Sequence, residues 1–276
     1  MKVAIIGGLG MLGTELMRFF PHATNIPHDL IAVEKITAPV LDGFDLVINC
    51  SAYHDVEECE KHPSRAFEVN YLGAHRLAEV CQHLEIDLVH ISTNMVFNGL
   101  KWSPYVPSDD PAPLNVYGYS KWMGECAIRD QMERGLKALI VRLGPIYGHA
   151  PCRGKGGRSF VSNVIKMAKE NKTLSFPLDQ TVNPVSAADA AGAIDLMVFR
   201  DEDFTGVQHV GSDNTCSWYE FAREVIHTEG IKTEVNPVFS HGPVKRPSNG
   251  VLKPSLKMPT WQDSLSRYFK SRSEGA

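Results

Sequence analysis

The sequence has no long hydrophobic run. Its longest apolar stretches are four residues, as in Val3 to Ile6 and Ala138 to Val141, whereas a membrane-spanning helix needs about 20. Lys2 is followed at once by a strand-like run and then by glycines, so a secretory signal peptide is not expected. We therefore expect a cytoplasmic protein that does not bind a membrane.

The sequence also lacks an excess of positive charge and any Cys-x-x-Cys pair. Its 28 Lys and Arg residues are outnumbered by 32 Asp and Glu residues, so the net charge of -4 gives no reason to expect nucleic-acid binding. The six cysteines are scattered, which favours reduced, buried thiols over disulfides or a metal site. With 43% hydrophobic residues in a chain of 276, a sizeable core is expected.

Short apolar strands alternate with amphipathic helices in the first half of the chain. We expect strands at 2–6, 23–26, 45–49, 87–92 and 137–142, and helices at 12–20, 64–84 and 117–132. This alternation is typical of a parallel sheet with right-handed crossovers. The sequence therefore predicts an α/β fold with a Rossmann-type doubly wound parallel sheet.

The alternation changes after Tyr147. The later segments, in chain order, are a glycine-rich basic loop at 149–158, a helix at 160–171, an extended segment at 173–184, and helix-opening capping boxes at 217–220 and 260–263. We expect residues 1–148 to form a dinucleotide-binding domain, to which a segment of roughly 184–210 returns. Residues 149–276 are expected to form a smaller C-terminal substrate-binding lobe.

A glycine triplet, Gly7, Gly10 and Gly13, joins the first strand to the first helix. Glycine at these places permits a tight turn, lets a pyrophosphate approach the backbone N–H groups, and lets the helix pack close to the strand. A plain turn is the alternative, but the buried strand before and the amphipathic helix after provide the context that dinucleotide binding requires. We expect this segment, with Met11 and Leu12, to bind the cofactor.

The choice between NAD(H) and NADP(H) is poorly marked. An acidic residue about 20 positions on would bind the ribose 2′-hydroxyl, and a basic one would bind a 2′-phosphate. The second strand ends in Asn25, Pro27 and His28, which provide neither, and Asp29 follows toward the adenine side. We expect NADP(H) or NAD(H), with NADP(H) slightly favoured.

Tyr117 and Lys121 lie one helical turn apart on one face of a predicted helix. A cation about 5 Å away would lower the pKa of a tyrosine, ordinarily near 10, by about two units at an effective dielectric constant of about 20. Thr93 ends a predicted strand, at the edge where doubly wound sheets bind ligands. If each signal is taken alone, the alternative for Tyr117 and Lys121 is a solvated helix face. The alternative for Thr93 is a hydroxyl that bonds a backbone group at the strand end.

Seven segments occur in the order seen in extended short-chain dehydrogenases/reductases. They are the glycine triplet, Asn49-Cys-Ser-Ala-Tyr53, Ala66-Phe-Glu-Val-Asn70, Ser92-Thr-Asn-Met-Val-Phe-Asn-Gly99, Pro113-Leu-Asn-Val-Tyr-Gly-Tyr-Ser-Lys121, Asp179-Gln180 and Arg246-Pro-Ser-Asn249. Over nearly its whole length the chain resembles the dTDP-4-dehydrorhamnose reductase group. The resemblance implies a Rossmann domain, a nucleotide-sugar substrate bound by a smaller lobe, and a homodimer as a possible assembly.

By this resemblance, Tyr117 would protonate the C4 ketone oxygen as NAD(P)H delivers hydride, Lys121 would lower the tyrosine pKa and bond the nicotinamide ribose, and Thr93 would orient the carbonyl. Residues implied along the cofactor are Asn49, Cys50, Ser51, Ala52 and Tyr53. Residues implied near the substrate are Asn94, Met95, Arg246 and Asn249. A surface charge is the alternative for Arg246, and Asn70 is expected to hold neighbouring backbone.

Four positions depart from the family pattern. Asn94 and Met95 replace the usual Asp and Tyr after the threonine, Pro145 stands where Trp is usual, and His54 replaces a threonine. The expected function is an NAD(P)H-dependent reductase of a 4-keto nucleotide-activated deoxysugar. One alternative is a nucleotide-sugar epimerase that keeps NAD bound; the other is a non-catalytic, cofactor-binding regulatory subunit, which the altered substrate wall suggests and the intact Thr93, Tyr117 and Lys121 disfavour.

Overall fold

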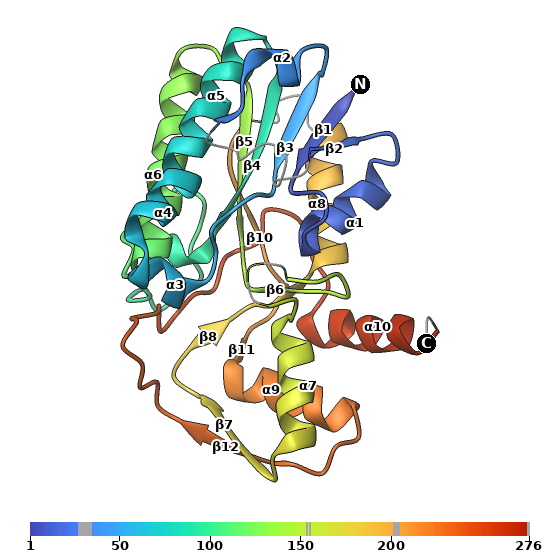
Figure 1. Cartoon of the computed structure of the whole chain (residues 1–276). Helices are drawn as coiled ribbons and strands as arrows, with labels where there is room; N and C mark the ends of the chain where they lie inside the picture. The colour runs from blue at the N-terminus through green and yellow to red at the C-terminus, as the bar shows by residue number, and fades with distance from the viewer. Residues whose placement is uncertain (27–34, 153, 155, 201–204, 275–276) are drawn as a thin grey trace.

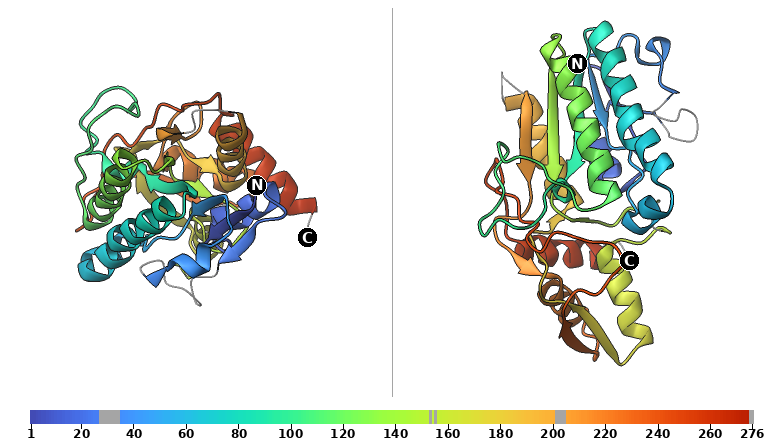
Figure 2. Two further views of the ribbon diagram at one scale, coloured as in Figure 1. Left: turned by 90° about the horizontal axis from the view of Figure 1, so that it is seen from above. Right: turned by 90° about the vertical axis from the view of Figure 1, so that its left-hand side faces the viewer.

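The computed structural model describes residues 1–26, 35–152, 154, 156–200 and 205–274. Figure 1 shows a parallel sheet with helices on both faces in the upper part of the molecule, and shorter strands and helices in the lower part. Figure 2 shows the same layers from above and from the side, with the last helix, α10, between the two parts. Asp29, expected near the adenine, lies outside the described residues.

The central sheet has six described strands, and every neighbouring pair is parallel. Their order across the sheet is β2-β1-β3-β4-β5-β10. The bounds are Val3–Ile6 for β1, Thr24–Ile26 for β2, Leu46–Asn49 for β3, Asp87–Thr93 for β4, Ala138–Leu143 for β5 and Gly206–Val210 for β10. The chain first adds a strand on one side of β1 and then continues on the other side, so β1 and β3 flank the point where doubly wound sheets bind ligands.

Alternate residues of each strand enter different cores. Val3 and Ile5 of β1 pack in the core that holds α1 (Met11–Phe19) and α8 (Ala187–Arg200). Ala4 and Ile6 pack on the opposite face, in the core that holds α2 (Ala38–Leu41), α5 (Gly73–His83) and α6 (Val116–Glu133). Because both faces are covered, β1 (Val-Ala-Ile-Ile) is continuously apolar. The predicted Rossmann-type sheet is confirmed.

The helix expected at 64–84 contains a wider turn. It divides into α4 (Pro63–Phe67), a π-helical turn at Glu68–Leu72 and α5, after a separate α3 (Val56–Lys61). The π turn carries Asn70 to α6, where a Cβ on Gly124 would lie 2.4 Å from the Asn70 carbonyl oxygen. The backbone of the π turn and α6 therefore approach each other where residue 124 has no side chain.

The lower part is built on short strand pairs and three helices. The bounds are Ile146–Tyr147 for β6, Phe160–Glu170 for α7, Thr173–Pro177 for β7, Thr181–Val182 for β8, Val185–Ser186 for β9, Cys216–Ser217 for β11, Trp218–Thr228 for α9, Glu234–Val238 for β12 and Trp261–Glu274 for α10. β7 pairs with β12, β8 with β11 and β6 with β9. Phe160, Phe221 and Trp261 belong to the aromatic core between α7, α9 and α10.

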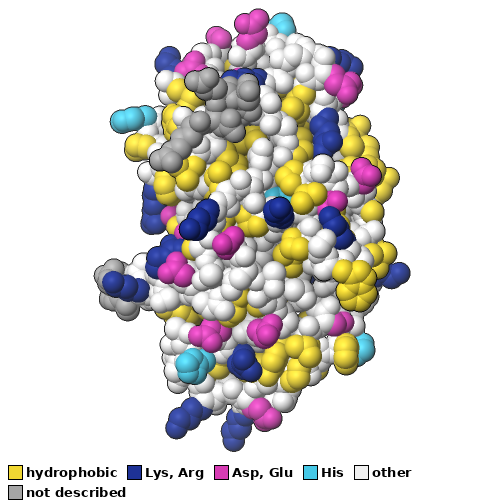
Figure 3. Space-filling model, turned by 180° about the vertical axis from the view of Figure 1, so that it is seen from behind, with side chains coloured by type: hydrophobic (Ala, Val, Ile, Leu, Met, Phe, Trp, Pro, Cys, Tyr) yellow, Lys and Arg dark blue, Asp and Glu magenta, His cyan; other side chains and the backbone are white. Residues whose placement is uncertain are grey.

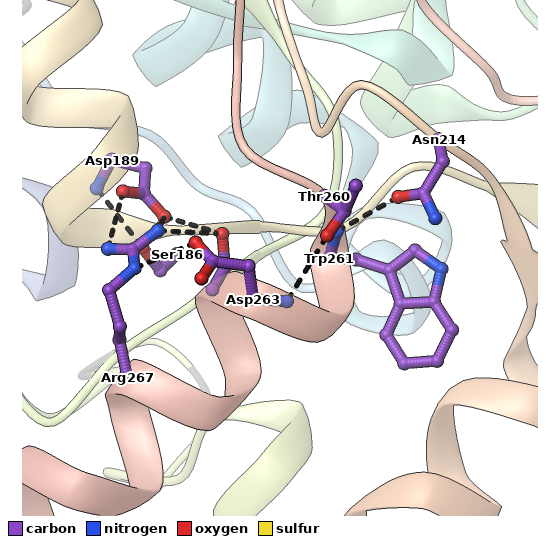
Figure 4. Close-up of polar contacts among 8 residues, drawn as sticks. Ser186, Asp189, Asn214, Thr260, Trp261, Asp263 and Arg267 are labelled. Carbon is purple, nitrogen blue, oxygen red and sulfur yellow. Dashed lines mark hydrogen bonds and ion pairs between the residues drawn. The ribbon is translucent and has the colours of Figure 1, made fainter.

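Polar contacts fasten α10 to α8 (Figure 4). Arg267 donates to both carboxylate oxygens of Asp189, at 2.9 and 3.1 Å. Asp189 also accepts from Ser186 and Ser264 at 2.6 Å each. The predicted capping box at Ser217 is complete, whereas at Thr260 one half is recorded, a 3.3 Å hydrogen bond from the Asp263 backbone N–H.

Two surface properties bear on partners. No helix among the described residues is long and apolar enough to cross a membrane. On the face seen in Figure 3, basic and acidic side chains are interspersed, so charge of one sign does not dominate that face.

Within the described structure none of the six cysteines forms a disulfide, as expected.

Candidate active site

The glycine loop after β1 fits a dinucleotide pyrophosphate. Gly7 has φ of +80°, a conformation that favours glycine. A Cβ on Gly13 would lie 2.2 Å from the Gly7 carbonyl oxygen, so only glycine lets α1 begin this close to β1. The N-cap of α1 is Gly10, which has no side chain that could accept a hydrogen bond from the first turn. The first N–H groups of α1, which include Met11 and Leu12, are therefore available to an anion.

The segment after β3 lies beside this loop. A Cβ on Gly7 would be 3.3 Å from the Ser51 backbone nitrogen. Asn70 fixes the same segment, because its amide accepts from the Tyr53 N–H and donates to the Tyr53 carbonyl, at 2.9 Å each. The expectation that Asn70 holds neighbouring backbone is confirmed. Cys50, Ser51, Ala52 and Tyr53 thus form the second wall of the expected cofactor site.

Burial raises the pKa of the Cys50 thiol to about 12, and the Lys121 charge only partly opposes this. Cys50 is therefore a thiol at neutral pH. Since the thiolate is the reactive form of cysteine, burial disfavours the nucleophilic form of Cys50.

Thr93 and Tyr117 meet at the carboxyl end of β4. Thr93 caps the 3₁₀ turn Asn94–Val96, accepting from the Met95 N–H at 3.2 Å, and its side chain acts to lower the pKa of the Tyr117 phenol. Asn115 caps α6 by accepting from the Gly118 N–H at 2.8 Å. These two caps fix the starts of the two elements that carry the pair.

Burial raises the pKa of the Tyr117 phenol, and the hydrogen bond with Thr93 opposes that effect. The sequence predicted a different dominant influence, a lowering by Lys121. In the structure, the Lys121 Nζ instead lies 3.1 Å from His90 Nε2, and desolvation outweighs every other influence on Tyr117. Tyr117 is therefore held as the neutral phenol, which is the form that can donate a proton.

Lys121 is 1% exposed, and burial lowers its pKa to about 8, against the opposing charge of Glu125. The expected helical spacing is present: Tyr117, Lys121 and Glu125 occur at intervals of four on α6. A lysine with a pKa this close to neutrality can change protonation in the working range of an enzyme.

A buried ion pair behind Lys121 was not predicted. Arg142 on β5 donates to both oxygens of Glu125, at 3.0 Å from Nε and 2.7 Å from a terminal nitrogen, and both side chains are at most 1% exposed. Ser92, next to Thr93, donates to the same carboxylate at 2.5 Å. Glu125 on α6 is thus bonded to Arg142 on β5 and to Ser92 on β4. These bonds fix the helix of Tyr117 against the strand of Thr93. An arginine inside an apolar strand was the signal in the sequence.

The residues expected near the substrate hold the segment 245–252 in place. Asn94 donates to the Gly250 carbonyl at 2.8 Å, and Asn249 donates to the Lys101 carbonyl at 2.6 Å. Arg246 forms an ion pair with Glu57 on α3. Met95 is half-buried beside Thr93. Direct contact of these side chains with a substrate stays a prediction.

The basic loop reaches back to the segment after β3. His54 Nε2 lies 3.1 Å from Cys152 Sγ, and a Cβ on Gly154 would lie 2.4 Å from the His54 ring. Arg158 is exposed. Arg153 and Lys155, the other cations of this loop, lie outside the described residues.

Comparison with known proteins gives consistent matches along the chain. The family described as the RmlD substrate binding domain matches residues 1–273. The spore coat polysaccharide biosynthesis protein SpsK of Bacillus subtilis is 31% identical, over 99% of this chain and 98% of its own length. Two solved dTDP-4-dehydrorhamnose reductases are similar in structure. That of Clostridium acetobutylicum has a TM-score of 0.90 and 28% identity, covering 99% of this chain and 100% of its own. That of Bacillus anthracis, in complex with NADP, has a TM-score of 0.89 and 29% identity, covering 98% and 99%.

Proposed function

Because the chain belongs to the RmlD substrate binding domain family, we propose that it is an NADPH-dependent reductase of the 4-keto group of a dTDP-activated deoxysugar, similar to dTDP-4-dehydrorhamnose reductase. The observation that carries this proposal is the contact between Thr93 and Tyr117 at the carboxyl end of β4, with Lys121 one turn further along α6. All three lie at the edge of the sheet where the glycine loop begins.

We assign the proton transfer to Tyr117. Bound NADPH supplies a hydride to the ketone carbon. Tyr117 donates its phenolic proton to the ketone oxygen as negative charge develops there. Thr93 donates a hydrogen bond to the same oxygen and so holds the carbonyl beside the phenol. Protonated Lys121 stabilises the tyrosinate that results, since opposite charges attract strongly where water is excluded.

The cofactor would lie across the ends of β1 and β3. The N–H groups at the start of α1 would bind its pyrophosphate, and Ser51 to Tyr53 would line its nicotinamide half. The NADP complex of the Bacillus anthracis relative supports NADP(H) over NAD(H). A net charge of -4 gives no general attraction for anions, so binding depends on these local groups.

We propose that residues 149–276, apart from the part of 184–210 that returns to the sheet, bind the nucleotide sugar. Segment 245–252 belongs to this lobe and reaches the catalytic strand through the contact of Asn94 with Gly250. A substrate held by this segment would have its ketone near Thr93. Arg246 and Asn249 are the side chains of this segment assigned to the nucleotide or its closing loop.

The test is a spectrophotometric assay of purified protein with dTDP-4-dehydrorhamnose and NADPH. We expect NADPH to be consumed in proportion to the ketone added. An epimerase would instead carry one tightly bound dinucleotide per chain and would show no net cofactor turnover. A regulatory subunit would bind NADPH, oxidise none with any keto sugar, and copurify with another enzyme.

A further inference from the structure

Lys121 lies at the end of a buried chain of hydrogen-bonding side chains. Its Nζ is 3.1 Å from His90 Nε2, and His90 Nδ1 is 3.2 Å from the Asn49 amide nitrogen. The oxygen of that amide accepts from Ser51, at 3.1 Å from the backbone nitrogen and 2.6 Å from the hydroxyl. Lys121, His90 and Asn49 are each 1% exposed, so water does not compete for these contacts.

Only one assignment of donors and acceptors satisfies the hydrogen bonds that connect Lys121, His90, Asn49 and Ser51. A backbone N–H can only donate, so the Ser51 N–H fixes Asn49 with its oxygen toward Ser51 and its NH₂ toward His90. The Asn49 NH₂ also only donates, so His90 Nδ1 must accept and carries no proton. A neutral imidazole then has its proton on Nε2, which faces Lys121.

An ammonium group at Lys121 does not fit that arrangement. It has three donors and no acceptor, so the Nε2–H of His90 would meet a second donor at 3.1 Å. The neutral amine has a lone pair and can accept this proton. Protonating His90 as well is disfavoured, because burial and the Lys121 charge lower the pKa of His90 well below its usual value.

The charges around Lys121 agree with this assignment. Groups that titrate or carry charge face it from four elements: Tyr117 and Glu125 on α6, His90 on β4, Cys50 after β3, and Arg142 on β5 behind Glu125. Arg142 neutralises Glu125, and Cys50 stays a thiol. The Glu125 charge favours a proton on Lys121, but burial outweighs it and lowers the Lys121 pKa.

We propose that His90 is a positioning residue that donates its Nε2–H to Lys121, favours the neutral amine, and thereby sets the upper pH limit of the reaction. This inference rests on the proposed reductase function, in which the ammonium form of Lys121 stabilises the Tyr117 tyrosinate. The reaction then needs the ammonium form of Lys121, whereas the hydrogen bond from His90 favours the amine. The alkaline limb of the pH–rate profile reports the equilibrium between these two forms of Lys121.

The tautomer of His90 can be observed without any turnover. In protein with ¹⁵N-labelled histidine, imidazole nitrogen shifts distinguish the two neutral tautomers and the cation. The His90 signals are those that disappear in His90→Gln. We expect the neutral Nε2–H tautomer at pH 7. The Nδ1–H tautomer or an imidazolium would overturn the proposal even if the chain proved to be an active reductase, and a chain inactive on keto sugars would leave this readout intact.

The kinetic test compares two substitutions at residue 90. His90→Leu removes the donor, so the alkaline limb of kcat/KM should move to higher pH by about one unit, the effect of one net hydrogen bond. His90→Gln keeps an N–H donor at the ε position, so its alkaline limb should stay near that of the wild type. A role in packing alone would lower the rate or stability of both variants without moving the limb, and that result would contradict the proposal.

Discussion

Gly118 lies directly against the backbone carbonyl of Met95: a methyl group on residue 118 would come within 2.2 Å of that oxygen. The contact joins the first turn of α6 to the 3₁₀ turn that begins after Thr93. Tyr117 precedes this glycine, so the close approach of the two backbones brings the phenol to the threonine hydroxyl.

Substitution Gly118→Ala should therefore separate Tyr117 from Thr93. We expect kcat to fall by about 10- to 100-fold, because small displacements of reacting groups cost rate steeply, while NADPH binding at the distant glycine loop persists. Steady-state kinetics and a cofactor titration measure both. Gly242→Ala is the control, since its added methyl would meet nothing closer than 3.9 Å. Equal kcat in both variants would contradict the role of this contact.

Substitution Glu125→Gln should be among the most destabilising in the chain. It leaves the fully buried Arg142 charge without its counter-ion, which typically costs about 3 to 5 kcal/mol of unfolding free energy. Glu79→Gln removes an exposed ion pair with Arg76 and should cost less than about 1 kcal/mol. Urea denaturation compares the two. Similar losses would show that the Glu125 network does not hold α6 to the sheet.

Substitution Gly13→Ala should abolish the cofactor site, because the added methyl would meet the Gly7 carbonyl oxygen at 2.2 Å and the Gly8 Cα at 2.6 Å. The rise in melting temperature that NADPH gives to the wild type should disappear. Leu9→Ala is the control in the same loop, since Leu9 is 45% exposed, and it should keep that rise. An unchanged rise in Gly13→Ala would place the cofactor elsewhere.

Asp189 should make stability depend on acid pH. Burial would raise its pKa, but hydrogen bonds from Arg267, Ser186 and Ser264 outweigh burial and lower the pKa below the usual 3.8. Its stabilising effect is therefore complete above about pH 4, the unfolded value, and is lost as pH falls through the lower folded pKa. We expect Asp189→Asn to lose roughly 2 kcal/mol at pH 7.

The difference between wild type and Asp189→Asn should shrink as pH falls below about 4, which denaturant titrations at several pH values will measure. Asp263 contacts the same Arg267 from an exposed position. Asp263→Asn should therefore change stability little at any pH. A difference for Asp189→Asn that does not vary with pH would contradict this assignment.

The strands and most helices could be predicted because the spacing of apolar residues within each segment indicates its secondary structure. β1, β3 and β5 are buried on both faces and are apolar except for Asn49 at the end of β3 and Arg142 in β5. The π turn at 68–72 could not, because it depends on Gly124, more than fifty residues away, leaving room for the Asn70 carbonyl. Helical spacing alone predicts an ordinary helix there.

The positions of the site residues could be predicted from the sequence, but their pKa values could not. Spacing placed Tyr117 and Lys121 on one face of a helix, and the structure keeps that relation. The pKa of each is governed by burial and by groups on other strands. His90 on β4 and Arg142 on β5 reach the site only through sheet pairing, which no local pattern specifies.

The central claim is that Tyr117 supplies the proton in reduction of a 4-keto nucleotide sugar. The direct measurement is ketone-dependent NADPH oxidation by Tyr117→Phe, which keeps the ring and removes the hydroxyl. Tyr119→Phe, two residues away on α6 and 45% exposed in the wild type, is the control. We predict that kcat falls by about 10² to 10⁴-fold in Tyr117→Phe and is unchanged in Tyr119→Phe. Full turnover by Tyr117→Phe would contradict the account.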